Sequence, residues 1–136
     1  KPLILGGGIS GLATAAALEN IAGISSQILE RATLQEFHNS QAGAGAQIGP
    51  NGLRALNAIG GNELMQKCID SGSIVKGTAM ILPGMPEPMM IPDTAEEDTG
   101  LPQVFVRWGI LREMLADQLS QSSTHTKQGD DVCGYK

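Results

Sequence analysis

The sequence predicts an α/β protein built around a strand–helix–strand unit. The apolar run Leu3–Leu5 ends in three glycines, and the Ala- and Leu-rich stretch from Ser10 to about Ala22 contains no proline. A second predicted strand, Ser26–Glu30, completes the unit within about 30 residues. Two parallel strands joined by a helix have a right-handed crossover in nearly all proteins. We therefore expect a parallel sheet led by these two strands, with helices packed on it.

Beyond this unit, a polar loop is expected over Thr33–Gln41, followed by a stretch of small residues. A helix is predicted to begin near Pro50, because proline is well tolerated in the first helical turn. The pair Gly60 and Gly61 is expected to break this helix. A second short helix then covers Asn62–Ile69.

The next segment, Gly77–Ile91, is predicted to form a small β hairpin, because prolines and glycine stand between its two apolar runs. The acidic stretch Pro92–Gly100 is expected to be an exposed loop. Val104–Val106 is a strand candidate, and apolar residues recur at helical spacing over Ile110–Leu119. The methionines of the hairpin region are expected to pack in the core or within the hairpin. They are Met80, Met85, Met89 and Met90.

The composition excludes several classes of partner. The net charge is −5 and no basic cluster exists, which argues against a nucleic-acid partner. No apolar run approaches the roughly 20 residues of a membrane span. Cys68 and Cys133 fit no metal-binding spacing, so no metal site is expected. From Ser120 to Lys136 the chain is polar, and neither helix nor strand is expected there.

The segment Gly6–Gly11 reads GGGISG and matches the pattern G-x-G-x-x-G. The first glycine, Gly6, permits a tight turn out of the strand. Gly8 lets the backbone approach a pyrophosphate, and Gly11 lets the helix pack closely on the strand. Backbone N–H groups at the helix start favour phosphate. The residues assigned to this phosphate-binding turn are Gly6, Gly8, Ile9, Ser10 and Gly11.

An acidic residue stands where this pattern requires one. Glu30 ends the second strand, nineteen residues beyond Gly11, close to the expected ~20. Its carboxylate can accept hydrogen bonds from both hydroxyls of an adenosine ribose; the alternative is a solvated charge at a strand end. An acid at this place disfavours a 2′-phosphate, and therefore NADPH as the occupant. The pattern does not separate NAD from FAD.

Three segments together resemble a known family. Leu5–Ala13 with Ile28–Ala32, then Gly43–Leu56, then Val106–Leu115 resemble, in order and spacing, the flavin monooxygenases related to para-hydroxybenzoate and salicylate hydroxylases. The resemblance covers about residues 3–119. It implies a Rossmann-like FAD/NAD(P)-binding fold, with residues 1–121 forming the N-terminal part of the FAD-binding domain. Residues 122–136 are then a polar tail, which we expect to be disordered.

The resemblance also implies roles for residues outside the glycine turn. Arg31 would lie along the adenine or a phosphate, and Arg107 would reach the pyrophosphate or the flavin. An arginine at a helix N-terminus opposes the helix dipole, which favours an anionic partner for Arg107. The small residues Ala44, Gly45 and Ala46 would form the backbone stretch that passes the isoalloxazine ring. The remaining arginines of these segments, Arg54 and Arg112, are interpreted as solvated helix faces.

As a function, the resemblance implies hydroxylation or epoxidation of an organic, aromatic or cyclic substrate, dependent on FAD, NAD(P)H and O2. FAD would be the bound cofactor and NAD(P)H a transient co-substrate. No catalytic acid, base or nucleophile is identifiable. The family's later Asp-Gly and Gly-Asp segments do not appear, so the chain looks like a fragment or a truncated product. The alternatives are an NAD-dependent dehydrogenase domain and a truncated, non-catalytic dinucleotide-binding chain. An intracellular, cytoplasmic site is expected, or an organelle if a transit peptide has been removed.

Overall fold

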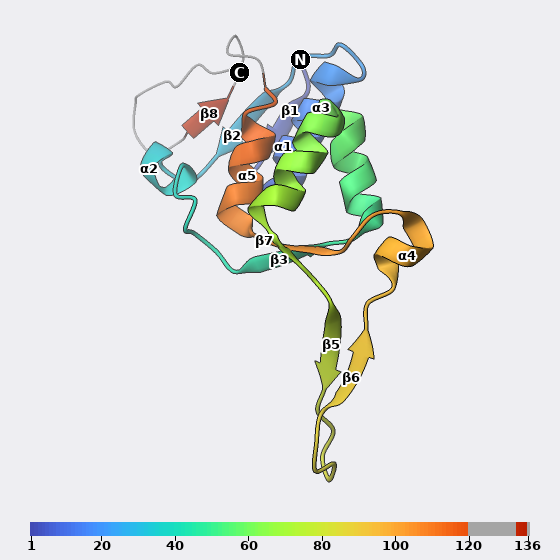
Figure 1. The fold of residues 1–136 in the computed structure, drawn as a ribbon. Coiled ribbons are helices and arrows are strands. Elements are labelled where there is room, and N and C mark those ends of the chain that lie inside the picture. The colour runs from blue at the N-terminus through green and yellow to red at the C-terminus, as the bar shows by residue number, and fades with distance from the viewer. Residues whose placement is uncertain (120–132, 136) are drawn as a thin grey trace.

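The computed structural model describes residues 1–119 and 133–135. The predicted strand–helix–strand unit is present as β1 (Leu3–Leu5), α1 (Ile9–Asn20) and β2 (Gln27–Glu30). The two strands pair in parallel, with Ile4 opposite Ile28. Because β1 and β2 run parallel, their carboxyl ends lie side by side (Figure 1). The glycine turn follows β1 at this edge, and Glu30 is the last residue of β2.

A third strand, β8 (Cys133–Tyr135), pairs antiparallel with β2 and sets Cys133 opposite Glu30. The expectation that no strand follows residue 120 is therefore wrong for these three residues. Three residues are too few to show a period, and β2 would otherwise present unpaired backbone groups at its edge. The rest of the tail for which we predicted disorder, residues 122–132 and 136, lies outside the described residues.

A second, antiparallel sheet has the order β3–β7–β4, formed by β3 (Gly45–Ile48), β7 (Val104–Arg107) and β4 (Ser73–Ile74). Only β7 was predicted. The other two are glycine- and alanine-rich or two residues long, and neither has the composition typical of strands. Successive residues of β7 alternate between buried and exposed, so one face of this sheet joins the core and the other is open to solvent.

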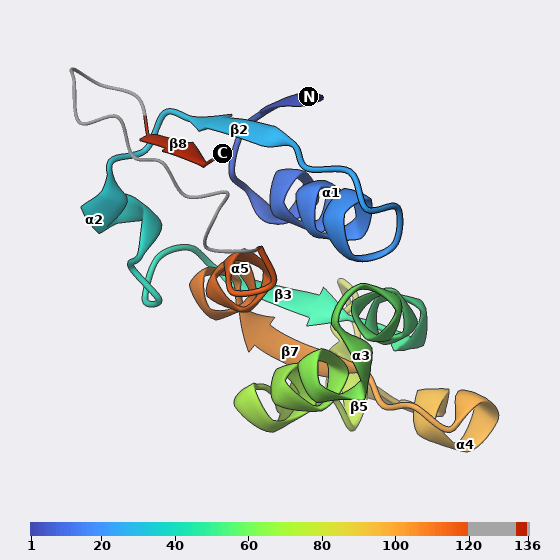
Figure 2. The same cartoon turned by 90° about the horizontal axis from the view of Figure 1, so that it is seen from above.

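The helices pack on one another and on the buried face of the second sheet (Figures 1 and 2). The long helix α3 (Pro50–Ser71) is interrupted where predicted, since Gly60 and Gly61 have non-helical backbone angles. The side chain of Asn20 donates a hydrogen bond to the Ile59 carbonyl, 3.0 Å away, and so joins the end of α1 to this break. The fully buried side chains of the core include Leu12, Ile28, Phe37, Leu53, Leu64, Val104, Val106, Leu111, Met114 and Leu115.

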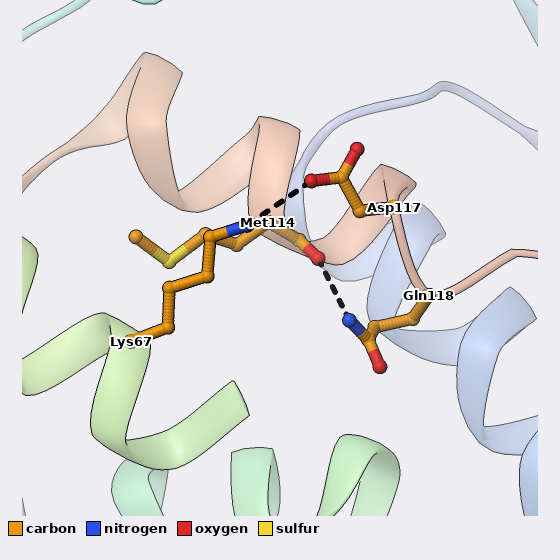
Figure 3. A network of polar contacts seen from close by, with 4 residues as sticks. All are labelled: Lys67, Met114, Asp117 and Gln118. Carbon is orange, nitrogen blue, oxygen red and sulfur yellow. Dashed lines mark hydrogen bonds and ion pairs between the residues drawn. The ribbon is translucent and has the colours of Figure 1, made fainter. Parts of the chain in front are cut away.

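The end of α5 (Trp108–Ala116) is fastened to α3 at the surface (Figure 3). Lys67 of α3 forms an ion pair with Asp117 at 3.2 Å. Beside it, the Gln118 amide donates to the Met114 carbonyl at 3.4 Å. Both partners of the ion pair are more than half exposed, so the contact adds little to the stability that core packing provides.

The predicted hairpin is present as β5 (Gly77–Met80) and β6 (Met89–Pro92), and it extends away from the helices (Figure 1). Its methionines are exposed, so of the two places expected for them, the core is wrong and packing within the hairpin remains. The acidic stretch after it contains a short helix, α4 (Ala95–Thr99), where a loop was expected; none of its residues is buried. No helix among the described residues is both long enough and apolar enough to cross a membrane.

A second short helix, α2 (Leu34–Phe37), lies in the segment predicted to be a polar loop. Thr33 and Glu36 form the reciprocal contacts of a capping box. The Glu36 carboxylate accepts from the Thr33 backbone N–H at 2.9 Å, and the Thr33 hydroxyl accepts from the Glu36 N–H at 3.3 Å. The spacing T-x-x-E is a recognised helix-start signal that the sequence analysis did not use.

Candidate functional site

The glycine turn has the backbone geometry that was predicted from its glycines. Gly6 has a φ of +102°, which strongly favours glycine. A Cβ atom on Gly11 would lie 2.0 Å from the Gly6 carbonyl oxygen, so α1 packs directly on the turn. A Cβ atom on Gly8 would meet nothing within 4 Å, so the space beside that residue is open. Ile9 and Ser10 begin the helix as expected, and the binding roles of these residues stay predictions.

Glu30 is oriented toward the turn by two backbone N–H groups. Its Oε2 accepts from Gly7 at 2.5 Å and its Oε1 accepts from Ala32 at 2.7 Å. Partial burial works to raise the pKa of Glu30, but backbone N–H groups of Ala32, Gly7 and Arg31, together with the charge of Arg112, lower this pKa below its usual value. The carboxylate is therefore ionised at neutral pH, and each oxygen keeps lone pairs for further donors.

Gly7, to which the sequence analysis gave no role, is also sterically constrained. A Cβ atom there would lie 3.0 Å from the Phe37 ring and 3.1 Å from Glu30 Oε2. Gly7 is buried, and Phe37 is fully buried behind it. The ring of Phe37 thus supports the Gly7–Glu30 contact from inside the protein.

The second glycine-rich segment runs into β3. Its course is set by the start of α5: the Trp108 N–H donates to the Ala44 carbonyl at 3.0 Å, and the Gly109 N–H donates to the Ala42 carbonyl at 3.2 Å. A Cβ atom on Gly45 would lie 2.1 Å from the Phe105 ring, and one on Gly43 would lie 3.1 Å from Trp108. In this structure, the space left by these two glycines is therefore occupied by aromatic rings of the same chain.

Arg107 ends β7 and stands at the N-cap of α5, as the sequence predicted. It is exposed, and its guanidinium donates to the Gln41 carbonyl at 3.4 Å, a long contact. A cavity of about 450 Å³ lies beside it, lined by Gly43, Ala44, Gly45, Ser71, Gly72, Ser73, Phe105, Arg107 and Ile110.

The structure brings only some of the predicted residues to this cavity. Ala44, Gly45 and Arg107 line it together. Ala46 pairs with the buried Val106 and is itself partly buried, so it lies on the opposite face of the strand. Arg31 is exposed at the end of β2 and is not among the lining residues.

The interpretation of Arg112 as a solvated residue is wrong. Only 5% of Arg112 is exposed. Its guanidinium carbon lies 4.6 Å from the centre of the Phe37 ring and 4.5 Å from that of Trp108. It also donates to the Glu36 carbonyl at 3.0 Å and to the Phe37 carbonyl. A planar cation can be buried this way, between aromatic faces and carbonyl oxygens.

The same interpretation holds for Arg54, which is exposed on α3 and donates to the Thr99 carbonyl at 3.2 Å. The aromatic partners of Arg112 were not identified from sequence. The available signal was the four-residue spacing of Trp108 and Arg112, which places both on one face of α5. Among the described residues, no group of three His, Cys, Asp or Glu side chains could hold a metal ion.

Comparison with known proteins supports the predicted resemblance. No family model matches the chain. The chain is similar to the FAD-dependent monooxygenase pynG of Aspergillus niger, with 48% identity over 58 residues, which cover 43% of this chain and 12% of that protein. It is also similar to 3-hydroxybenzoate 6-hydroxylase of Klebsiella oxytoca, with 39% identity over 67 residues, which cover 49% of this chain and 16% of that protein.

A solved structure shares the fold. A variant of HpxO from Klebsiella pneumoniae, complexed with FAD, matches with a TM-score of 0.65 and 22% identity, over 89% of this chain and 29% of that one. The predicted resemblance to FAD-dependent monooxygenases and the Rossmann-like fold are thereby confirmed. The matched segments span a small part of the curated relatives' length.

Proposed function

From the resemblance to FAD-dependent monooxygenases, we propose that this chain binds the adenosine diphosphate half of FAD within a flavin-dependent monooxygenase. The observation that carries the proposal is the arrangement around Glu30. Its ionised carboxylate is held by the Gly7 N–H at the end of β2, beside the open space at Gly8. A carboxylate in this place can accept both ribose hydroxyls, while the N–H groups that open α1 face the phosphates.

The described residues fit the adenosine diphosphate group in three respects. The carboxylate of Glu30 interacts with the backbone N–H groups of Gly7, Ala32 and Arg31, which fix its orientation without using all of its lone pairs. The turn at Gly8 leaves room for a pyrophosphate to approach the backbone. The N-terminus of α1 has no acidic residue in its first turn, so no side chain of that turn repels an anion.

For the flavin side we propose that the ligand runs along Ala44, Gly45 and Ala46 and past Arg107. In support, Ala44, Gly45 and Arg107 line one cavity, and Arg107 is an exposed cation at its edge. Gly45 is covered by Phe105, a half-exposed side chain that can turn away into solvent. Arg31, exposed beside the ribose acid, is proposed to contact the adenine or a phosphate.

When bound, FAD would take electrons from NAD(P)H and activate O2 to hydroxylate or epoxidise an organic, aromatic or cyclic substrate. The described residues of this chain bind and orient the cofactor in the proposed reaction, and we assign no proton-transfer step to any of them. One similar protein is named as a hydroxylase of 3-hydroxybenzoate, which favours the aromatic class. NAD(P)H is proposed as a co-substrate that does not occupy the Glu30 site.

The test is an FAD titration of the 136-residue chain, followed by flavin fluorescence, with NAD as a competitor. Glu30→Gln keeps the size of the side chain but removes its charge. Loss of a charged hydrogen-bond partner costs about 1.5–3 kcal/mol, which predicts FAD binding weaker by about ten- to a hundredfold. Glu63→Gln, the same change at an exposed position of α3, is the matched control.

The proposal stands if FAD binds saturably, if excess NAD does not displace it, and if only the Glu30 variant loses affinity. Equal FAD affinity of the two variants would refute the assignment of Glu30. Preferential binding of NAD over FAD would instead favour a dehydrogenase-type domain.

A further inference from the structure

The buried guanidinium of Arg112 is costly for the fold, because a cation loses its hydration when it is buried. No described carboxylate lies within ion-pair distance of it. Its Nε–H is buried and donates to no described acceptor. The direct contacts that offset this cost are two carbonyl oxygens and two aromatic ring faces. The charge of Glu30 also attracts the guanidinium, from beyond ion-pair distance. All four direct contacts belong either to the end of α2 or to Trp108 at the start of α5.

One of the two rings, Phe37, contacts the segment proposed to bind the adenosine part of FAD. Arg112 donates to the Glu36 and Phe37 carbonyls and lies over the Phe37 ring, so it fixes both the backbone and the side chain of Phe37. The same ring stands 3.0 Å from the position of a Cβ atom on Gly7. The Gly7 N–H in turn holds Glu30. The position of the ribose acid therefore depends on Arg112 through a chain of direct contacts.

The other ring, Trp108, contacts the segment proposed to lie along the flavin. Trp108 contacts the same guanidinium, with 4.5 Å between its ring centre and the guanidinium carbon. Its ring is in contact with Gly43, where a Cβ atom would lie 3.1 Å from it, and its backbone N–H holds the Ala44 carbonyl. The guanidinium thus contacts both a ring that supports the glycine turn and a ring that supports the second segment.

We propose that Arg112 is a positioning residue that sets the distance between the two segments that contact FAD. This inference rests on the proposed function. A dinucleotide must contact both segments at once, so a change in their separation weakens a ligand that spans both more than a ligand that touches only one. Arg112 itself touches neither the proposed ribose site nor the cavity, since it is buried and is not among the lining residues.

The variants that test this are Arg112→Met and Arg112→Lys, with Arg54→Met as the control. Arg54 also donates to a backbone carbonyl, but at an exposed position. Each variant is titrated with FAD, which spans both segments, and with ADP, which reaches only the first. Amide hydrogen exchange of Gly7 and Trp108 is measured by NMR without ligand, with the α1 amide of Leu12 as internal reference.

For Arg112→Met we expect FAD affinity to fall about tenfold or more, because buried carbonyls lose their donor. ADP affinity should fall less, and exchange at Gly7 and Trp108 should become faster while that at Leu12 is unchanged. Arg112→Lys should be intermediate, since lysine keeps the charge but has no planar face to stack. Arg54→Met should match the wild type in every measurement.

An equal loss of FAD and ADP affinity, or unchanged exchange at Gly7 and Trp108 in a folded variant, would overturn the inference. A wild-type chain that binds neither ligand would refute the proposed function, and the exchange rates would still decide whether Arg112 holds both segments. If Arg112→Met does not fold, Phe37→Leu provides the same test. That change removes one ring face but keeps an apolar side chain, and it should accelerate exchange at Gly7 more than at Trp108.

Discussion

The two glycine-rich segments differ in what fills the space beside their glycines. At Gly8 a Cβ atom would meet nothing within 4 Å, whereas at Gly45 it would lie 2.1 Å from the ring of Phe105. In the first segment, the space beside Gly8 is open, whereas the space beside Gly11 is closed by the Gly6 carbonyl; these are its open side and its closed side. Around the second, the space is taken by aromatic side chains, Phe105 at Gly45 and Trp108 at Gly43.

The difference shows that a glycine-rich stretch does not by itself mark a surface left free for a ligand. In the first segment, the glycines were explained one by one from the turn, and the structure has that geometry. In the second, the space beside Gly45 that was predicted to admit a flat ligand is filled by a side chain of the same protein. The half-exposed ring of Phe105 covers Gly45, where the flavin was predicted to pass.

The largest effect is expected for Gly11→Ala, which tests the closed side of the first segment. The new methyl group would lie 2.0 Å from the Gly6 carbonyl oxygen, and a backbone atom cannot move away without opening the turn. We expect a loss of about 3 kcal/mol in the free energy of unfolding, at the upper end for overpacking. Urea denaturation followed by circular dichroism measures it. A loss below about 1 kcal/mol would show that α1 can shift without disturbing the turn.

The same substitution at Gly8 tests the open side. Gly8 has φ −75° and ψ −178°, a conformation that alanine adopts freely, and its Cβ atom would meet no protein atom. The free energy of unfolding should therefore change by less than about 0.5 kcal/mol. FAD affinity should fall about tenfold or more, because the methyl group would occupy the space that the proposal assigns to the pyrophosphate. Unchanged FAD affinity in a stable Gly8→Ala variant would place the phosphates elsewhere.

Much of the fold was predictable from the spacing of apolar residues and from the positions of glycine and proline in the sequence. The glycine turn, the break at Gly61 and the hairpin were all predicted, because glycine and proline act locally and their conformational effects do not depend on distant residues. The strands β3, β4 and β8 were missed because they are stabilised by a partner strand. Each is only two to four residues long, too short for an alternating pattern to show, so the pairing with another strand defines them.

The candidate site shows the same limit. Glu30 was predicted because its distance along the chain from the glycine turn is fixed by the strand–helix–strand unit. Phe37 and Arg112 were not, because they are 75 residues apart in sequence and meet only when α5 packs beside α2. The residue type alone does not show whether an arginine is buried or exposed. Arg112 differs from Arg54 in its aromatic neighbours, which are distant in sequence or become neighbours only in the folded helix.

A smaller effect is expected in the second segment, where Gly45→Ala forces the new methyl group against the Phe105 ring. That ring is 51% exposed and belongs to a side chain that can rotate, so the cost should be about 1 kcal/mol. In the background of Phe105→Ala, the same change at Gly45 should cost almost nothing, and a double-mutant cycle measures the difference. If the cost persists without the ring, the restriction at Gly45 arises from the backbone, and the contrast with Gly8 disappears.

The smallest effect is a pH dependence that belongs to the first segment alone. Because the pKa of Glu30 is lowered in the folded protein, its ionised form stabilises the fold. This stabilisation is fully present above the ordinary carboxyl pKa of 4.5 and is lost as the pH falls through the lower value of the folded state. The difference in unfolding free energy between wild type and Glu30→Gln should therefore be constant at neutral pH and shrink below pH 4.5. Glu36, whose pKa is lowered by its hydrogen bonds to the Thr33 backbone and hydroxyl, is present in both proteins, so its contribution cancels. A difference that stays constant as the pH falls below 4.5 would show that the charge of Glu30 does not stabilise the fold.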